Sequence, residues 1–272
     1  MTALRCLYTD LDGTLLGARA SLLHDADGAF TLLGVRALEA CARAGAEVVP
    51  VSGRRKATTG EIARLLGQTA YAFELGCGVV VDGEETLLTG HFQPRDGRSV
   101  YELITESGAP RLLLERYAGR LEYHSPWQEG RDFTHLLRGL VDTDEANALL
   151  ASSGHDDLRL VDNGAIAPKP SLPDLDEAPH AYHLMPRAAS KAVAVEAHMR
   201  ARGLFPSDCI AVGDSREDVD IAPHVDRFFL VANGASKDPS LASQPNVEVT
   251  EGRNGEGFYE AVVRSLAEAR AA

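Results

Sequence analysis

The stretch Asp10-Leu11-Asp12-Gly13-Thr14-Leu15-Leu16 directly follows the apolar run Leu4 to Tyr8. The run is typical of a buried strand, so two carboxylates stand where that strand ends. Carboxylates at such a place are costly unless a metal or a reaction uses them. Asp and Gly are also common turn residues, which gives a purely structural alternative. Three further motifs, in a fixed order along the chain, favour the chemical interpretation.

The second motif is the apolar strand predicted over Val48–Val51, which delivers Ser52, Gly53 and Arg54. By itself, a Ser-Gly pair after a strand usually forms only a turn. The third is Lys191, at the start of a segment whose pattern predicts a helix ending at Gly203. A single lysine would ordinarily be a solvated surface residue, so its meaning depends on the other motifs.

The fourth motif is a strand predicted over 209–213, followed by a loop that contains Asp214 and Asp218. Carboxylate oxygens suit Mg²⁺, which binds through a few carboxylates and the substrate phosphate. Acidic residues also stabilise a helix N-terminus, and the residues after Ser215 are predicted to begin a short helix. We expect both explanations to hold together.

The four motifs together resemble those of the haloacid dehalogenase (HAD) superfamily. The resemblance implies that Asp10 attacks phosphorus to form an aspartyl phosphate, while Asp12 handles the proton of the leaving group and then of water. It implies a phosphate-binding set made of Ser52, Gly53 and Lys191. It also implies that Mg²⁺ is held by Asp10, Asp12, Asp214 and Asp218.

Other positions are weaker candidates. Glu217 stands where the HAD pattern usually has Asn. Arg54 directly follows the second motif and is predicted to face the substrate. Asn233, near a further strand end, is a candidate for substrate binding, although a helix cap or a turn explains it equally well. Arg138 and His135 are candidates in the middle of the chain, where each also fits an ordinary surface or strand position.

The outer parts of the chain alternate between predicted strands and helices, which favours an α/β fold with a parallel sheet flanked by helices. Helices are predicted over 31–44 and from Thr58, where Thr58 and Glu61 match a capping box. In such folds ligands bind at the carboxyl ends of the strands. All four motifs fall at predicted strand ends.

The pattern changes between Leu75 and Met185. Hairpins are predicted at Asp82-Gly83 and Asn163-Gly164, a half-buried strand over 132–137, and a helix capped at Asp142. This antiparallel α+β insert is similar to the C2-type cap of HAD subfamily IIB, which includes Cof-type, sucrose-phosphate and mannosyl-3-phosphoglycerate phosphatases. The predicted organisation is a Rossmann-like HAD core over 1–82 and 186–272, with a cap over 83–185.

Composition excludes several other classes. A net charge of −13 argues against binding to nucleic acid, which depends on clustered Lys and Arg. No apolar run is long enough to cross a membrane and no signal peptide is evident, so we expect a cytoplasmic protein. The four cysteines show no metal-ligand spacing, which predicts neither a disulfide nor zinc. Gly76-Cys77-Gly78 lacks the third glycine of a dinucleotide-binding motif.

The sequence therefore predicts a Mg²⁺-dependent phosphatase that acts on a small phosphorylated metabolite, either a sugar phosphate or a glycosyl-glycerate phosphate. A phosphomutase or phosphotransferase would use the same aspartyl phosphate but return it to a second hydroxyl group. A non-catalytic binding protein on the HAD fold is the alternative from another class. It would not need all four motifs.

Overall fold

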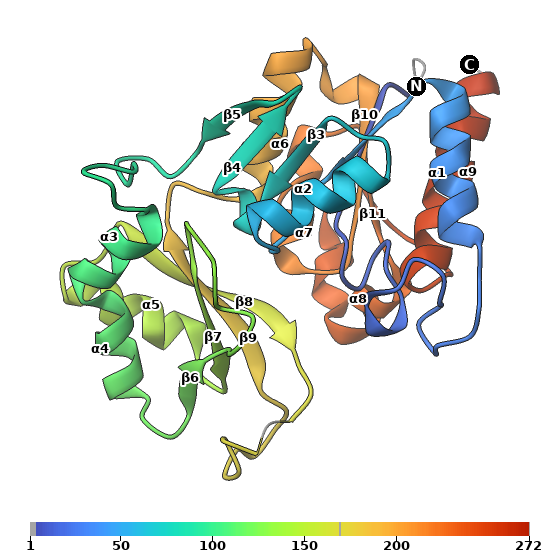
Figure 1. Ribbon diagram of the computed structural model, residues 1–272. Helices are drawn as coiled ribbons and strands as arrows, with labels where there is room; N and C mark the ends of the chain where they lie inside the picture. The colour runs from blue at the N-terminus through green and yellow to red at the C-terminus, as the bar shows by residue number, and fades with distance from the viewer. Residues whose placement is uncertain (1–3, 169, 272) are drawn as a thin grey trace. The chain divides into compact units, whose positions relative to one another are not determined.

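The computed structural model describes residues 4–168 and 170–271, and the chain divides into two compact units (Figure 1). One unit contains the chain up to Thr86 and from Lys191 onwards, and the other is Leu87–Ser190. These limits lie a few residues beyond those of the predicted cap, 83–185. The difference arises because the hairpin after Asp82 stays with the first unit and the last strand of the second unit runs to Pro186.

The first unit is built on a five-stranded sheet in the order β12-β11-β10-β1-β2, with all neighbouring strands parallel. The strands are β1 (Cys6–Thr9), β2 (Glu47–Pro50), β10 (Cys209–Gly213), β11 (Arg227–Leu230) and β12 (Val247–Val249). A second, three-stranded sheet contains β3 (Ala70–Phe73), β4 (Gly78–Val81) and β5 (Glu84–Leu87). The predicted α/β class is confirmed.

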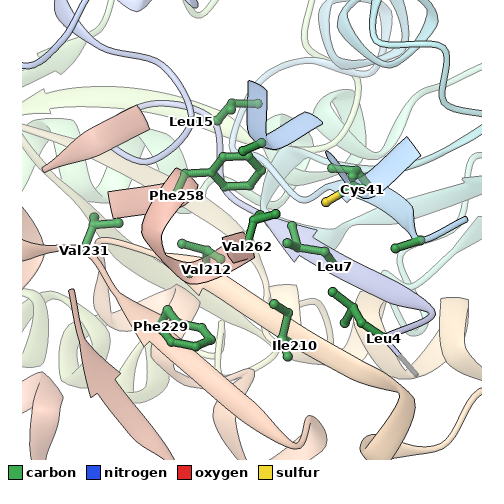
Figure 2. Packing of buried hydrophobic residues seen from close by; sticks show 14 of the residues in the cluster. Leu4, Leu7, Leu15, Cys41, Ile210, Val212, Phe229, Val231, Phe258 and Val262 are labelled. Carbon is green, nitrogen blue, oxygen red and sulfur yellow. The ribbon is translucent and has the colours of Figure 1, made fainter. Parts of the chain in front are cut away.

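Helices α1 (Leu33–Ala44) and α9 (Asn254–Ala271) lie side by side over one face of the five-stranded sheet. Figure 2 shows their apolar side chains packed on the strands, with Cys41 and Phe258 facing Leu7, Ile210 and Val212. On the other face α6 (Lys191–Arg202) contacts Tyr8 of β1 through His198. The remaining helices of this unit are α2 (Lys56–Leu65), α7 (Arg216–Val219) and α8 (Ala232–Lys237).

The second unit is an antiparallel sheet in the order β6-β7-β9-β8 with helices packed on one face. Its strands are β6 (Leu121–Tyr123), β7 (His135–Gly139), β8 (Leu158–Ala165) and β9 (His180–Pro186). Its helices are α3 (Val100–Ser107), α4 (Ala109–Arg116) and α5 (Thr143–Ser152). This is the α+β composition predicted for the middle of the chain.

Several local predictions are confirmed. Asp82 and Gly83 both have positive φ, 52° and 89°, and form the two-residue turn between β4 and β5. Asp142 caps α5 by accepting hydrogen bonds from the backbone N–H groups of Asp144 and Glu145. Helix α6 ends just before Gly203, as predicted.

Two local predictions are wrong. Helix α2 begins at Lys56, not at Thr58, so no capping box forms, and the hydroxyl of Thr59 bonds back to the carbonyl of Arg55. Asn163-Gly164 is not a hairpin turn, because β8 continues through it with an irregular register against β9. Pairing along the neighbouring strand outweighs the local turn preference there.

Within the described residues, no helix is long and apolar enough to span a membrane.

Candidate active site

Asp10 stands immediately after β1, at the carboxyl edge of the sheet. Its backbone N–H continues the parallel pairing by donating to the carbonyl of Val212 on β10, at 3.1 Å. The Asp10 side chain is only 8% exposed. Burial is the largest influence and raises the pKa of Asp10 well above its usual value, with Lys191 opposing it. A buried carboxylate held this way needs positive charge nearby.

Lys191 supplies part of that charge. It is the first residue of α6, and its side chain is 2% exposed. Its Nζ atom donates to Oδ1 of Asp10 and to Oδ1 of Asp218, both at 2.6 Å. Burial lowers the pKa of Lys191, but the two carboxylates outweigh it and raise the pKa above its usual value. Lys191 is therefore a permanently charged bridge between the first and fourth motifs.

Asp10, Asp214 and Asp218 form an acidic cluster in which one oxygen of each carboxylate lies within 4.8 Å of the others. Burial and the neighbouring carboxylate of Asp218 raise the pKa of Asp214, and the nearby lysines Lys237 and Lys191 oppose this shift. Gly13 permits the close approach: a Cβ atom there would lie 2.5 Å from Oδ2 of Asp214. Clustered carboxylate oxygens are the donors that Mg²⁺ prefers, so this set fits the predicted metal.

The three carboxylates of the cluster differ in how many hydrogen bonds their oxygens already accept. Oδ2 of Asp218 accepts hydrogen bonds from the backbone N–H groups of Asp214 and Ser215 and from the Ser215 hydroxyl. Its other oxygen faces Lys191. Asp218 is therefore held as an orienting group, and the carboxylates of Asp10 and Asp214 are better placed to bind a cation directly.

Asp12 lies in a different environment, with its side chain 53% exposed. Arg54 donates two hydrogen bonds to the Asp12 carboxylate, Nε to Oδ2 and Nη2 to Oδ1, each 2.6 Å long. Arg54 was predicted to face the substrate, and the structure brings it onto Asp12. These two hydrogen bonds fix the orientation of a carboxylate that is otherwise open to solvent.

Ser52 and Gly53 follow β2, the strand next to β1. Val51 donates its backbone N–H to the carbonyl of Thr9 at 2.8 Å, so the ends of the first and second motifs lie side by side. Ser52 is buried, and its hydroxyl accepts a hydrogen bond from the backbone N–H of Arg54. The parallel pairing of β1 and β2 therefore brings the second motif to the edge where Asp10 stands.

Asn233 also lies at this edge. Its Nδ2 atom donates to the carbonyl of Gly13 at 2.8 Å and to Oδ2 of Asp214 at 3.3 Å. Its Oδ1 atom accepts from the backbone N–H of Asn254, whose own side chain donates to the carbonyl of Leu16. Asn233 thus ties the first motif to the fourth.

Sequence reasoning missed Lys237, whose Nζ lies 2.9 Å from Oδ2 of Asp214. It also missed the positioning role of Asn254. Lys237 is one turn of helix beyond Asn233 on the short helix α8, and no spacing rule singled it out. The buried hydroxyl of Thr14 has no hydrogen-bond partner within the described residues.

Arg138 belongs to the second unit. It lies on β7 and bonds to Glu122, Ser171 and the carbonyl of Ser125, so its guanidinium group is already satisfied within that unit. His135, on the opposite face of β7, stacks on Tyr101 of α3 with ring centroids 3.8 Å apart. His135 is therefore a buried packing residue.

The sequence did not predict a further set of polar side chains, His183, Thr134 and Arg131, on the same side of this sheet as Arg138. Register places Leu136 opposite His183, so the histidine shares a face with Arg138 and Glu122. The hydroxyl of Thr134 lies 3.2 Å from Nδ1 of His183 and accepts from the Arg131 guanidinium at 3.2 Å. These groups are buried on a sheet face opposite the one that α3 covers.

Comparisons with known proteins agree with this arrangement, although no family model matches the chain. A curated phosphoglycolate phosphatase from Methanoculleus marisnigri is 27% identical over 262 residues, covering 95% of each chain. Another from Halorubrum lacusprofundi is 28% identical over 236 residues, covering 85% of this chain and 87% of the relative.

Solved structures show the same fold. The sucrose-phosphatase from Synechocystis, solved with sucrose and phosphate, superposes with a TM-score of 0.67 at 14% identity and covers 97% of this chain and 98% of its own. A haloacid dehalogenase-like hydrolase from Bacteroides thetaiotaomicron superposes with a TM-score of 0.62, also at 14% identity, covering 96% of this chain and 98% of its own. The chain therefore has the fold of haloacid dehalogenase-like hydrolases, which is the fold that its four motifs predicted.

Proposed function

We propose that this protein is a Mg²⁺-dependent phosphatase that hydrolyses a small phosphate monoester through an aspartyl phosphate on Asp10. The observation that carries the proposal is the buried bridge of Asp10, Lys191 and Asp218 beside Asp214. A purely structural site would not bury two carboxylates on one lysine, beside a third carboxylate, at a sheet edge. The similarity to two phosphoglycolate phosphatases over most of the chain supports the same reaction class.

The proposed reaction has two steps. Asp10 attacks phosphorus, the ester P–O bond breaks, and Asp12 gives a proton to the departing oxygen. Asp12 then takes a proton from water as that water attacks phosphorus and releases Asp10. Lys191, Ser52 and the Gly53 amide would bind the phosphoryl oxygens. A Mg²⁺ ion held by Asp10, Asp214 and the Asp12 carbonyl would shield the negative charge of nucleophile and phosphate.

Arg54 has a defined part in this proposal. Its two hydrogen bonds hold Asp12 in one orientation, which keeps an exposed acid–base group near its point of use. A phosphate dianion would compete with Asp12 for the same guanidinium, because both present paired oxygens. Arg54 would then link phosphate binding to the position of Asp12.

Two substrate classes deserve a direct comparison. Sugar phosphates and glycosyl-glycerate phosphates are the prediction from the sequence, and a sucrose-phosphatase shares the fold. Phosphoglycolate is the second candidate, since the two curated relatives carry that activity in their names and match most of the chain.

The test is turnover by full-length enzyme dialysed against a chelator and then supplied with Mg²⁺, Ca²⁺ or Zn²⁺. We expect activity to return with Mg²⁺ in wild type and in Asp220→Asn, an exposed control at the end of α7, and to stay absent in Asp214→Asn. Full activity without metal would refute the metal assignment. A panel of phosphoglycolate, sugar phosphates, nucleotides and phosphopeptides then ranks substrates by kcat/KM.

Two further readouts separate the alternatives. Hydrolysis in isotopically labelled water puts the label into released phosphate, whereas transfer to a second hydroxyl group does not. A non-catalytic binding protein would release no phosphate from any ester in the panel and would form no phosphorylated peptide containing Asp10.

A further inference from the structure

A second group of metal-ligating side chains lies in the first unit, apart from the acidic cluster. One ligand atom each of Cys6, Glu47 and His198 lies within 4.8 Å of the other two. Cys6 is the first residue of β1, whereas Asp10 follows its last residue. At the rise of a strand, the two positions are roughly 13 Å apart. The group therefore lies at the opposite edge of the sheet from the candidate active site.

The sheet register creates this group. Cys6 pairs in register with Glu47 on β2 and with Cys209 on β10. Side chains in register on neighbouring strands project from the same face, and helix α6 adds His198 from above that face. Cys6 and His198 are buried, while the Glu47 side chain is 22% exposed and leaves a route for an ion.

His198 has one nitrogen held and the other without a hydrogen bond. Its Nδ1 lies 2.9 Å from the hydroxyl of Tyr8. Its Nε2 is buried and has no hydrogen-bond partner among the described residues, although Oε2 of Glu47 is 3.3 Å away. A histidine that binds a metal through one nitrogen is typically oriented by a partner on the other. Tyr8 provides that partner here.

The charges also balance. A divalent cation bound to one thiolate, one carboxylate and one neutral imidazole leaves no net charge in the buried site. Arg202, which now bonds to Glu47, also donates to both oxygens of Asp82 and so keeps a counter-ion. Thiolate and imidazole are ligands that zinc-like cations prefer over Mg²⁺.

We propose that Cys6, Glu47 and His198 bind a thiophilic divalent cation of the zinc class, with water as the fourth ligand. Binding breaks the S–H bond of Cys6, releases its proton to solvent and forms the metal–sulfur bond. His198 lies seven residues after Lys191, two turns along the same face of α6. The cation would therefore link α6, the helix that begins at Lys191, to strands β1 and β2. Spacing rules miss such a site, because its ligands come from three separate elements.

The test uses Co²⁺ as a spectroscopic probe on the full-length, reduced, chelator-treated protein, with Mg²⁺ in excess to occupy the acidic cluster. We expect one equivalent of Co²⁺ with a sulfur-to-cobalt charge-transfer band in the near ultraviolet. The band should vanish in Cys6→Ser and persist in Cys41→Ser, a matched buried cysteine outside the group. Tyr8→Phe should keep the band but weaken cobalt affinity by about 10- to 100-fold.

Glu47→Gln and His198→Gln guard against a folding defect in Cys6→Ser. Each should lower cobalt affinity at least about tenfold while circular dichroism remains that of wild type. No charge-transfer band in wild type, or a band that survives Cys6→Ser, would overturn the proposal. Asp214→Asn should leave the thiolate band in place, so failure of this site is distinguishable from failure of the phosphatase assignment.

Discussion

Two regions of the molecule bury charged side chains but assemble them differently. One is the edge of the five-stranded sheet that carries the acidic cluster, here called the acidic edge. The other is the polar face of the antiparallel sheet in the second unit, here called the inserted sheet. At the acidic edge, Asp10, Ser52 and Asp214 each follow the end of a parallel strand, and Lys191 begins a helix. On the inserted sheet, Arg138 and His183 share a face only because antiparallel strands pair in one register. The residues of the first arrangement can be recognised as motifs in the sequence, whereas those of the second cannot.

This difference suggests a division of work. The strand-end residues would perform a reaction common to many phosphate esters, while the inserted sheet would distinguish one ester from another. In that case substitutions at the acidic edge should reduce turnover of every substrate alike. Substitutions on the inserted sheet should change the ranking of substrates.

The largest effect is expected for Asp10→Asn. The neutral amide is a poor nucleophile, so kcat should fall by more than about 10⁴-fold for every ester tested. The same fold is expected, because Asn has nearly the same shape and can still meet Lys191. Mass spectrometry of a single turnover should find a phosphorylated peptide containing Asp10 in wild type only. Near wild-type turnover by highly purified Asp10→Asn would exclude Asp10 as the nucleophile.

Asp12→Asn should have a smaller effect that depends on the leaving group. Loss of acid–base catalysis typically costs about 10² to 10⁴-fold. An aryl phosphate needs little protonation of its leaving oxygen, so its first step should be slowed less than that of an alkyl phosphate. Single-turnover formation of the aspartyl phosphate from both esters measures this difference. Equal slowing of both would count against the acid role of Asp12.

The sequence was sufficient for most of the acidic edge, since strand ends and motif order determine which residues meet there. Lys237 escaped because its contact with Asp214 depends on how one turn of α8 is placed after a loop. The wrong capping box at Thr58 and the wrong hairpin at Asn163-Gly164 show local preference yielding to strand pairing and to the path of the chain.

The inserted sheet tests the second half of the comparison. Arg131→Gln removes a buried guanidinium that bonds to Thr134. The proposed division of work requires this guanidinium also to pair with the leaving group of the ester, and loss of such a buried partner costs about 1–3 kcal/mol, or roughly 5- to 150-fold. We expect that loss in kcat/KM for the best natural ester and a change of less than about twofold for p-nitrophenyl phosphate, whose turnover should depend on the acidic edge alone. Arg111→Gln, an exposed arginine on α4, is the control. Equal losses for both esters would break the proposed division of work.

The smallest effect concerns the stability of the second unit in acid. Burial lowers the pKa of His135 to about 4, and its ring is enclosed by Tyr101, Tyr123 and Thr105. The unfolded chain takes up this proton below its ordinary pKa of about 6.5, while the folded chain does not until about pH 4. Stability present above pH 6.5 is therefore lost as the pH falls from 6.5 towards 4.

From pH 7 to pH 5 the loss from this histidine amounts to about 2 kcal/mol. Urea denaturation followed by the fluorescence of Trp127, the only tryptophan and a residue of the second unit, measures it. His135→Gln should be less stable than wild type at pH 7 but show a flatter pH dependence. His91→Gln, at an exposed histidine of the same unit, should keep the wild-type slope. An unchanged slope in His135→Gln would show that other groups control the acid sensitivity of the inserted unit.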